Sequence, residues 1–292
     1  MKGTAMKEQV EIFEVGPRDG LQNETRLIPV AEKIALIDAL SDVGFQHIEV
    51  ASFVSPKWVP QMADSDAVLA GISRKPGLAY TALVPNMQGY EAAIAAGVDE
   101  VAIFASASEG FSQKNINCSI AESFERFAPI LAAARHADIP VRGYVSCVTD
   151  CPYDGPVAPD AVARVAADLF AAGCYEISLG DTLGKATPDS VARMLIAVLK
   201  EVPAHRLAGH FHDTEGRAIA NIDASLALGL RVFDTAAGGL GGCPYAPGAA
   251  GNVATEAVAA HLAALGFETG LDTTKLEAAA ELARRMRIGG DV

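Results

Sequence analysis

Eight short apolar segments recur along the chain, and each is followed by a longer segment with the periodicity of an amphipathic helix. This alternation is typical of βαβ units, whose strands lie parallel in one sheet. The predicted strands are Val10–Val15, His47–Phe53, Leu78–Val84, Glu100–Ala105, Pro140–Cys147, Tyr175–Gly180, Arg206–Asp213 and Val232–Ala237. The predicted helices are 31–43, 64–72, 88–96, 119–137, 158–172, 187–201, 218–228 and 255–265, with a last helix at about 272–287.

A strand count of eight favours a closed barrel over an open, doubly wound sheet, and no GxGxxG turn follows the first strand. No Ser/Gly-rich or like-charged linker interrupts the alternation in the 292 residues. We therefore expect one α/β domain, residues 1–292, folded as a single (β/α)8 TIM barrel. Residues 1–9 are expected to be disordered, and residues 272–292 to form an additional C-terminal helical segment.

Glycines mark the expected ends of several helices, because a residue without Cβ enters the left-handed region at little cost. They are Gly44, Gly97, Gly173, Gly229 and Gly266. A helix start is marked at Thr187-Pro188, where a capping hydroxyl precedes a proline at the first helical position.

The net charge of -13 excludes the sequence-independent attraction to nucleic acid or to an anionic membrane, which needs clustered Lys and Arg. A negatively charged protein attracts a divalent cation more readily than it attracts a polyanion. No apolar run approaches the roughly 18 residues of a membrane span, and the first ten residues resemble no leader. The five cysteines have no CxxC spacing, which favours free thiols in a reducing compartment. We therefore expect a soluble, cytoplasmic protein with no nucleic-acid or membrane partner.

Chemistry in such barrels sits where the strands run into the following loops. The first predicted strand ends in a run of polar side chains from Glu14 to Glu24, which is either catalytic or a solvated loop. The seventh ends in His210-Phe211-His212. Because side chains alternate along a strand, the two imidazoles point to one face and are a plausible half of a metal site, although such a pair also arises by coincidence.

The eighth predicted strand opens into a loop with six glycines in fifteen positions, residues 238–252. Such a loop is either built for close backbone approach and movement over a site, or is a flexible surface loop.

Seven ordered motifs together resemble the 3-hydroxy-3-methylglutaryl-CoA lyase family, over about residues 10–265. They are VGPRDGLQNE, SFVSPKWVPQM, KNINCS, GYVSC, GCYEISLGDT, HFHDT and GLGGCPYAPGAAGN. The resemblance implies a metal-dependent barrel enzyme of leucine breakdown. The implied reaction cleaves an acyl-CoA substrate, 3-hydroxy-3-methylglutaryl-CoA, to acetyl-CoA and acetoacetate.

The resemblance also implies a set of metal ligands, which are Asp19, His210, His212 and Asn252. A carboxylate, two imidazoles and an amide oxygen favour Mg²⁺ or Mn²⁺ over a thiolate-bound Zn²⁺. Four protein ligands leave about two positions of an octahedral shell for a chelating substrate.

Further roles follow from the same likeness. Arg18 is expected to hold the thioester oxygen as negative charge develops there, and Cys243 to protonate the resulting carbanion as a general acid. The other expected catalytic residues are the carboxylates Glu49 and Asp181. The expected substrate-binding residues are Gln22, Ser52, Lys114, Asn115 and Glu256. A purely structural hydrogen-bonding role is the alternative for Ser52, and we expect His47, His136, His205 and His261 to be structural.

Three other functions are compatible with the sequence. The first is a lyase for a larger 3-hydroxy-3-alkylglutaryl-CoA, and the second is a condensing acyl-CoA synthase of the same superfamily. Against the synthase, Cys243 lies where a charged GERAGN-type loop would be expected. The third is a metal- or CoA-binding protein without catalysis. Thr149-Asp150 and Glu215 depart from the family pattern near the catalytic face and put the substrate preference in question. A homodimer or homotetramer is implied by the likeness.

Overall fold

Eight parallel strands form a closed barrel in the computed structural model, which describes residues 8–243 and 246–288. Neighbouring strands follow the order β1-β10-β9-β8-β5-β4-β3-β2, and β2 pairs with β1 to close the ring. The strands are β1 (Glu11–Glu14), β2 (His47–Ser52), β3 (Ala79–Leu83), β4 (Glu100–Ser106), β5 (Val141–Ser146), β8 (Glu176–Asp181), β9 (Leu207–Phe211) and β10 (Val232–Thr235). The predicted barrel is confirmed, and each predicted strand overlaps an observed one, with β4 and β8 each ending one residue later than predicted.

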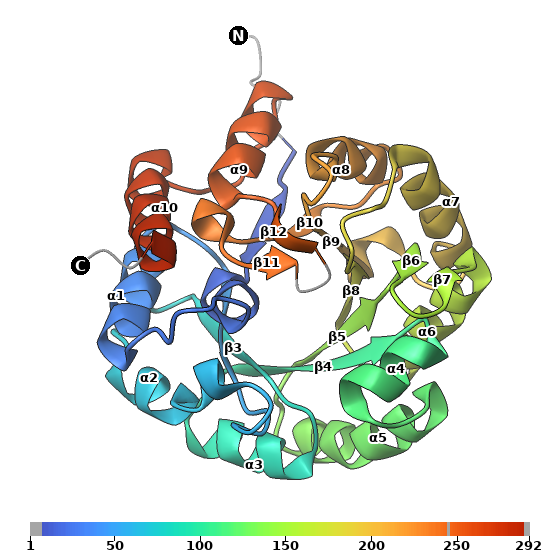
Figure 1. Ribbon diagram of the computed structural model, residues 1–292, viewed down its shortest axis with the longest axis horizontal. Coiled ribbons are helices and arrows are strands. Elements are labelled where there is room, and N and C mark those ends of the chain that lie inside the picture. The colour runs from blue at the N-terminus through green and yellow to red at the C-terminus, as the bar shows by residue number, and fades with distance from the viewer. Residues whose placement is uncertain (1–7, 244–245, 289–292) are drawn as a thin grey trace, which may run out of the picture.

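Helices surround the strands as an outer ring (Figure 1). They are α1 (Val30–Ser41), α2 (Ser65–Gly71), α3 (Met87–Ala95), α4 (Glu109–Ile116), α5 (Ile120–His136), α6 (Pro159–Ala172), α7 (Pro188–Val198), α8 (Ala218–Ala227), α9 (Thr255–Ala264) and α10 (Thr273–Ile288). The last of these lies beside α1 and α9, in the place of the predicted C-terminal helical segment.

Several short elements lie in loops where the sequence shows no periodicity. They are the π-helix η1 (Gly16–Gly20), the 3-10 turns η2 (Pro60–Met62), η3 (Ala204–Arg206) and η4 (Ala237–Gly239), and the hairpins β6 (Asp150–Cys151) with β7 (Gly155–Pro156) and β11 (Gly242–Cys243) with β12 (Ala246–Ala250). Neither these elements nor α4 were predicted from the sequence. Elements of two to eight residues complete too few turns or alternations for a periodic signal.

The predicted helix boundaries have the expected local chemistry. All five glycines named as helix ends have positive φ, between 80° and 111°. Thr187 caps α7 by accepting from the backbone N–H of Ser190, with Pro188 at the first helical position. These interactions use the polar groups that a helix end leaves unpaired.

The molecule has two interiors of different character. Between strands and helices lies a continuous apolar core, to which Leu36, Ile103 and Leu169 contribute fully buried side chains. Inside the barrel, by contrast, lie buried charges such as Arg142 and Asp234, the first fully buried and the second 1% exposed. Buried charges must be paired to be tolerated, so the inner network carries constraints that the outer core does not.

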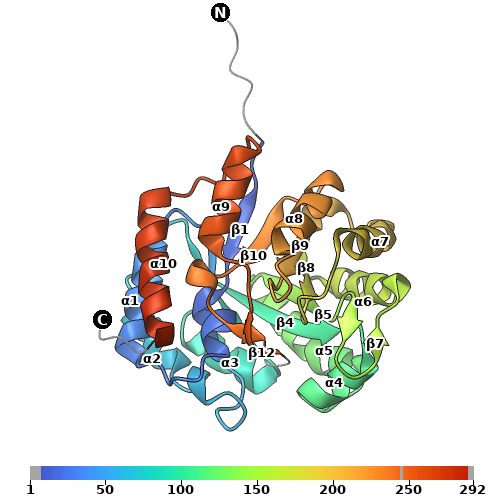
Figure 2. The ribbon, with the colours of Figure 1, turned by 45° about the horizontal axis from the view of Figure 1, so that its top comes forward.

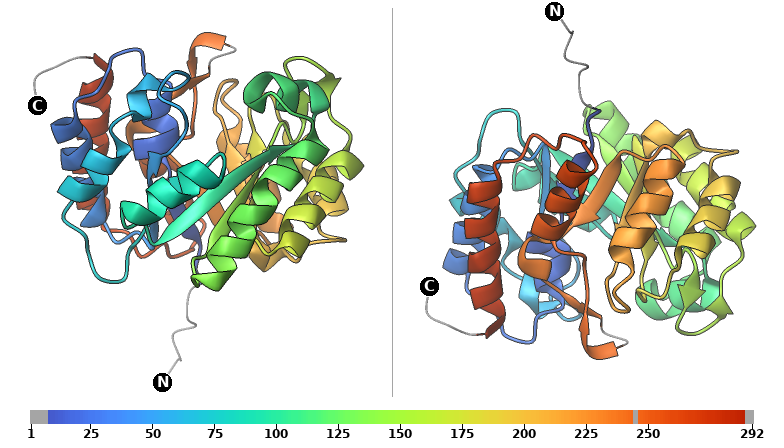
Figure 3. Two further views of the ribbon diagram at one scale, coloured as in Figure 1. Left: turned by 90° about the horizontal axis from the view of Figure 1, so that it is seen from below. Right: turned by 90° about the horizontal axis from the view of Figure 1, so that it is seen from above.

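The β11–β12 hairpin stands at the end of the barrel opposite the start of β1 (Figures 2 and 3). This is the end at which the parallel strands terminate, the mouth of the barrel, and the floor is the other end. Residues 1–7 of the segment expected to be disordered lie outside the described residues, whereas Gln9 pairs with Glu268. No helix within the described ranges is long and apolar enough to cross a membrane.

Candidate metal centre and active site

The π-helix η1 turns the chain directly after β1 and places Arg18 and Asp19 at the mouth. The backbone N–H groups of Arg18, Asp19 and Gly20 all donate to the carbonyl oxygen of Val15. A Cβ atom on Gly20 would lie 2.6 Å from Cβ of Leu240, so glycine permits the turn to lie against the glycine-rich loop. The turn after β1 and the loop after β10 are therefore tightly packed against each other at the mouth.

The two predicted histidine ligands come from the end of β9. Their ring centroids are 5.4 Å apart. Asn252 lies beside His212 because the segment after β12 runs antiparallel to the end of β9, with an isolated bridge between the two residues. Both histidines and Asn252 are buried.

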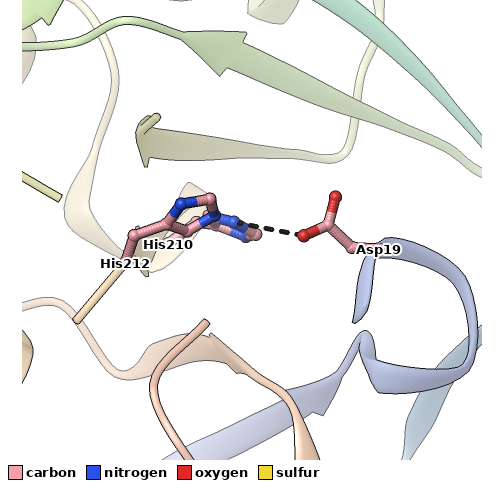
Figure 4. Close-up of side chains that lie close together, drawn as sticks. All are labelled: Asp19, His210 and His212. Atoms are coloured by element: carbon pink, nitrogen blue, oxygen red, sulfur yellow. Dashed lines mark ion pairs between the residues drawn. The ribbon is translucent and has the colours of Figure 1, made fainter. Parts of the chain in front are cut away.

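The structure brings Asp19, His210 and His212 together as a possible metal site (Figure 4). One potential ligand atom from each lies within 4.8 Å of the others. The Nδ2 group of Asn252 donates to Asp19 Oδ2 at 2.8 Å, which joins the fourth predicted ligand to the cluster. The predicted grouping of these four side chains is thus seen in the fold.

Unpaired buried atoms show that this donor set fits a cation. His212 Nδ1 and Asn252 Oδ1 are buried with no hydrogen-bond partner among the described residues. Leaving such atoms unpaired costs free energy, and native proteins rarely do so without a functional reason. A divalent cation bound here would use the free lone pairs of Asn252 Oδ1.

The charges of the cluster suit metal binding as well. Burial alone would raise the pKa of Asp19, but the charges of Arg18 and of the two histidines outweigh it and lower the pKa to about 2. Burial, followed by the proximity of His210, lowers the pKa of His212 to about 4. At neutral pH, Asp19 is therefore a carboxylate and His212 a neutral imidazole, the forms that bind metals.

Arg18 is held rigidly beside the cluster. Its Nε donates to Glu49 Oε2 at 2.6 Å and its Nη1 donates to Asp19 Oδ1 at 2.7 Å. Its guanidinium carbon lies 5.6 Å from the centroid of the Tyr144 ring. Because a guanidinium carries five N–H donors, a fork fixed in this way still has N–H groups to offer a substrate.

The two expected catalytic carboxylates have different surroundings. Glu49 is fully buried, its Oε1 has no partner among the described residues, and burial raises its pKa. Asp181 accepts from the backbone N–H groups of Lys185 and Ala186 in its own loop, and burial raises its pKa to about 6. Glu49 has an open acceptor beside Arg18, whereas Asp181 shapes the loop after β8.

The expected substrate-binding residues are spread over the mouth. Gln22 lines an open pocket that includes Trp58, and the buried oxygen atoms Gln22 Oε1 and Ser52 Oγ have no hydrogen-bond partner among the described residues. Lys114 and Asn115 are exposed on α4, which follows β4. The structure joins none of these four side chains to the metal cluster by a recorded contact.

Glu256 contributes to the support of the glycine-rich loop. Its carboxylate accepts from the backbone N–H of Gly238 at 3.0 Å and from Arg284 Nη1 at 2.8 Å. These contacts tie α10 to the turn η4. The backbone of Cys243 lies in β11, but its side chain is outside the described residues, so the predicted general acid is not placed.

A buried network below the histidines was not predicted from the sequence. Asp234 of β10 accepts from His210 Nδ1, from Ser178 and from Arg142. Burial alone would raise the pKa of Asp234, but Arg142 and then His210 outweigh it and hold the pKa well below its ordinary value. Acidic and basic residues inside otherwise apolar strands were the available signal, because a charge in a buried strand needs a partner.

The departures from the family pattern have separate environments. Thr149 is buried, and its hydroxyl oxygen has no hydrogen-bond partner among the described residues. Asp150 contributes, after burial, to the raised pKa of Asp181. Glu215 is exposed and forms an ion pair with Arg217, which offsets its charge at the rim of the mouth.

Comparison with known proteins indicates the family of the chain. The chain is 58% identical over 279 residues to the hydroxymethylglutaryl-CoA lyase of Pseudomonas mevalonii, covering 96% of this chain and 92% of the relative. It is 60% identical over 267 residues, covering 91% and 89%, to a 3-hydroxy-3-isohexenylglutaryl-CoA/hydroxymethylglutaryl-CoA lyase of Pseudomonas aeruginosa. The crystal structure of the HMG-CoA lyase from Brucella melitensis superposes with a TM-score of 0.96 at 62% identity, covering 96% of this chain and 99% of that one.

The family model described as HMGL-like matches residues 9–283, nearly the whole chain. The family predicted from the seven sequence motifs is thereby confirmed. This chain belongs to the HMGL-like family.

Proposed function

We propose that this protein is a divalent-metal-dependent carbon–carbon lyase that cleaves 3-hydroxy-3-methylglutaryl-CoA to acetyl-CoA and acetoacetate. The observation that carries the proposal is the cluster of Asp19, His210 and His212 at the barrel mouth, with Arg18 ion-paired to Asp19. The relatives named as lyases of this substrate support it. Leucine degradation is the corresponding proposed pathway.

The four residues Asp19, His210, His212 and Asn252 would hold the cation. We assign Mg²⁺ or Mn²⁺, because oxygen and imidazole donors suit these ions and the cluster includes no cysteine. When bound, the cation supplies Lewis-acid stabilisation of negative charge on the tertiary hydroxyl oxygen of the substrate.

The reaction needs one proton to leave the C3 hydroxyl and one proton to reach C2. The C2–C3 bond breaks with its electron pair on C2, which gives the ketone of acetoacetate and the enolate of acetyl-CoA. No other reactant is consumed. Glu49 is the proposed acceptor of the hydroxyl proton, because its Oε1 is unpaired and burial raises its pKa.

Arg18 is the proposed donor to the thioester oxygen as the enolate forms. Glu49 and Asp19 fix its guanidinium before substrate arrives, so little reorganisation is needed when negative charge develops. The open N–H groups of the fork provide the oxyanion contact.

Cys243 is the proposed general acid that protonates C2. It lies on the hairpin beside the mouth, and hairpin movement would bring substrate and acid together. Asp181, Gln22, Ser52, Lys114, Asn115 and Glu256 remain proposed contributors. For Lys114 and Asn115 we propose contacts with the CoA portion, and for Glu256 and Gln22 support of the residues around the metal.

The decisive experiment measures acetyl-CoA release from a panel of 3-hydroxy-3-alkylglutaryl-CoA thioesters, with Mg²⁺, with Mn²⁺ and after chelation. We expect release from the methyl compound, its loss on chelation, and its recovery with either ion. Faster release from a long 3-alkyl compound would favour the activity that the P. aeruginosa relative also carries in its name. Metal and thioester binding without release would contradict a lyase, and net condensation would favour a synthase.

The proposed assembly is a homodimer or homotetramer, which light scattering coupled to size-exclusion chromatography would test. The proposed compartment is the cytoplasm. Four described cysteines are free thiols, as expected in a reducing environment; they are Cys118, Cys147, Cys151 and Cys174.

A further inference from the structure

Asp234 lies directly beneath the metal cluster, on the strand next to the one that carries the histidine ligands. In the parallel pairing of β10 with β9, Asp234 is the register partner of His210. Its carboxylate is fully buried, and its Oδ2 lies 3.1 Å from His210 Nδ1. The barrel itself therefore brings the acid to the side of the imidazole that faces away from Asp19.

The carboxylate of Asp234 is fixed from below by a guanidinium fork. Arg142 Nη2 donates to Oδ1 at 2.7 Å and Nη1 donates to Oδ2 at 3.1 Å. Ser178 donates its hydroxyl to Oδ2 at 2.6 Å. A carboxylate that faces a bidentate guanidinium and a hydroxyl donor is an acceptor on both oxygens, and its plane cannot rotate without breaking these contacts.

The contact with Asp234 determines which nitrogen of His210 carries the proton. Because Asp234 Oδ2 accepts, the hydrogen of the imidazole must be on Nδ1. The lone pair is then on Nε2, which lies 3.9 Å from Asp19 Oδ2, on the side of the cluster.

We propose that Asp234 is a positioning residue that fixes the tautomer and ring orientation of His210, so that Nε2 is presented to the cation. Arg142 and Ser178 act through Asp234 and keep its carboxylate in place. Partners of this kind behind a ligating histidine are worth roughly 10- to 100-fold in metal affinity. The inference rests on the proposed metal-dependent function, and none of these three residues was singled out by the sequence.

The test compares Asp234→Asn with the matched control Glu176→Gln. Asparagine keeps the shape of the side chain, but its amide has one acceptor oxygen where the carboxylate has two. That oxygen cannot accept from both His210 Nδ1 and the Arg142 guanidinium as the carboxylate does. Glu176 also pairs with Arg142, through Nε at 2.8 Å. Glu176→Gln therefore removes a carboxylate from the same arginine without touching His210. Mn²⁺ affinity is measured by electron paramagnetic resonance, without substrate.

We expect Asp234→Asn to raise the Mn²⁺ dissociation constant by about 10- to 100-fold and Glu176→Gln to change it by less than about 3-fold. Circular dichroism and thermal unfolding check that both variants are folded. An Asp234→Asn protein that binds Mn²⁺ within about 3-fold of the wild type would overturn the proposal. Equal weakening by both variants would also overturn it, because the effect would then be one of charge around Arg142.

A measurement on the unaltered protein covers the case in which Asp234→Asn does not fold. In the Mg²⁺-loaded protein labelled with ¹⁵N-histidine, His210 is assigned by comparison with His210→Gln. We expect a hydrogen-bonded proton on Nδ1 of His210 and none on Nε2; the reverse tautomer would rule the proposal out. Since both readouts omit substrate, a protein that binds Mn²⁺ as expected but releases no acetyl-CoA would contradict the proposed lyase and leave this inference standing.

Discussion

The floor and the mouth of the barrel are built from the same kinds of residue, histidines with carboxylates and a buried arginine, yet the two clusters differ in what they leave unpaired. At the floor, both ring nitrogens of His47 face carboxylates, Glu11 at 2.6 Å and Glu100 at 3.4 Å. The ring also stacks on Phe13, with centroids 5.1 Å apart. The recorded contacts of His47 therefore use both of its polar atoms.

The mouth leaves several buried polar atoms without a partner among the described residues. Besides His212 Nδ1 and Asn252 Oδ1, they include Glu49 Oε1, Ser52 Oγ and Thr149 Oγ1. Residue type therefore does not separate a structural cluster from a functional one. Unused hydrogen-bonding capacity does, because a protein pays for it in stability unless a ligand restores the missing contacts.

The largest expected effect comes from the mouth. In His212→Ala, acetyl-CoA release should fall by about 10³-fold or more, because the lost cation stabilises charge worth several kcal/mol and 1.36 kcal/mol is a factor of ten. In the metal-free protein the unfolding midpoint should fall far less than turnover, because the stabilisation from a bound cation is then absent from both wild type and variant. His261→Ala, which removes a histidine paired with Asp223 far from the mouth, is the control. A large loss of stability in His212→Ala with retained turnover would show that the cluster at the mouth is structural.

A second mouth substitution tests geometry at constant charge. Arg18→Lys should lower kcat by about 10²- to 10³-fold, because a single ammonium cannot bond Glu49 and Asp19 and still reach the thioester oxygen. Steady-state kinetics measure the effect, and the exposed Arg285→Lys is the matched control. Near-normal turnover would remove Arg18 from the mechanism.

At the floor, the expected effect is on stability and depends on pH. Burial alone would lower the pKa of His47, but Glu100 and Glu11 outweigh it and raise the pKa to about 9. A raised folded-state pKa means that the stabilisation is complete below the unfolded value of about 6.5 and is lost as pH rises through about 9. His47→Gln should therefore cost about 2 kcal/mol at pH 7 and much less at pH 9.5, with turnover unchanged.

Urea unfolding at pH 6, 7.5 and 9.5 measures this dependence, with the exposed His205→Gln as control. A difference between wild type and His47→Gln that stays constant across this range would show that packing against Phe13, rather than charge, is what His47 contributes.

The smallest effect is expected at the rim of the mouth. Glu215 is exposed and paired with Arg217, and such surface pairs are worth about 0–1 kcal/mol. Glu215→Gln should change kcat/KM for the methyl substrate by less than about 3-fold. A larger change, dependent on the 3-alkyl group, would show that the rim takes part in substrate choice.

The sequence was sufficient to predict what depends on local patterns. Apolar runs predicted each barrel strand, and the resemblance to the lyase family, carried by motifs at the strand ends, implied that Asp19 and the two histidines would meet. The π-helix η1 was not predictable, because GPRDG has the composition of a turn and the i→i+5 bond to Val15 appears only in three dimensions.

Long-range pairing was equally out of reach. Arg142 and Asp234 meet across the barrel interior, and their contact follows from the registers of β5, β8, β9 and β10 together. Likewise, nothing near Glu256 in sequence indicates that Arg284 of α10 occupies one of its oxygens. Propensity identifies elements, whereas the partner of a buried charge is a property of the closed fold.

The position of Asp19 across the β1–β10 junction from His210 has a consequence for chain synthesis. Asp19 follows the first strand of the barrel, whereas His210, His212 and Asn252 flank the last two strands, and β1 pairs directly with β10. A nascent chain that has not yet delivered β10 has no surface on which these donors meet. A cation bound at the finished cluster, as proposed above, would therefore favour the closed barrel over a chain in which β1 and β10 have separated, to an extent set by the concentration of the cation.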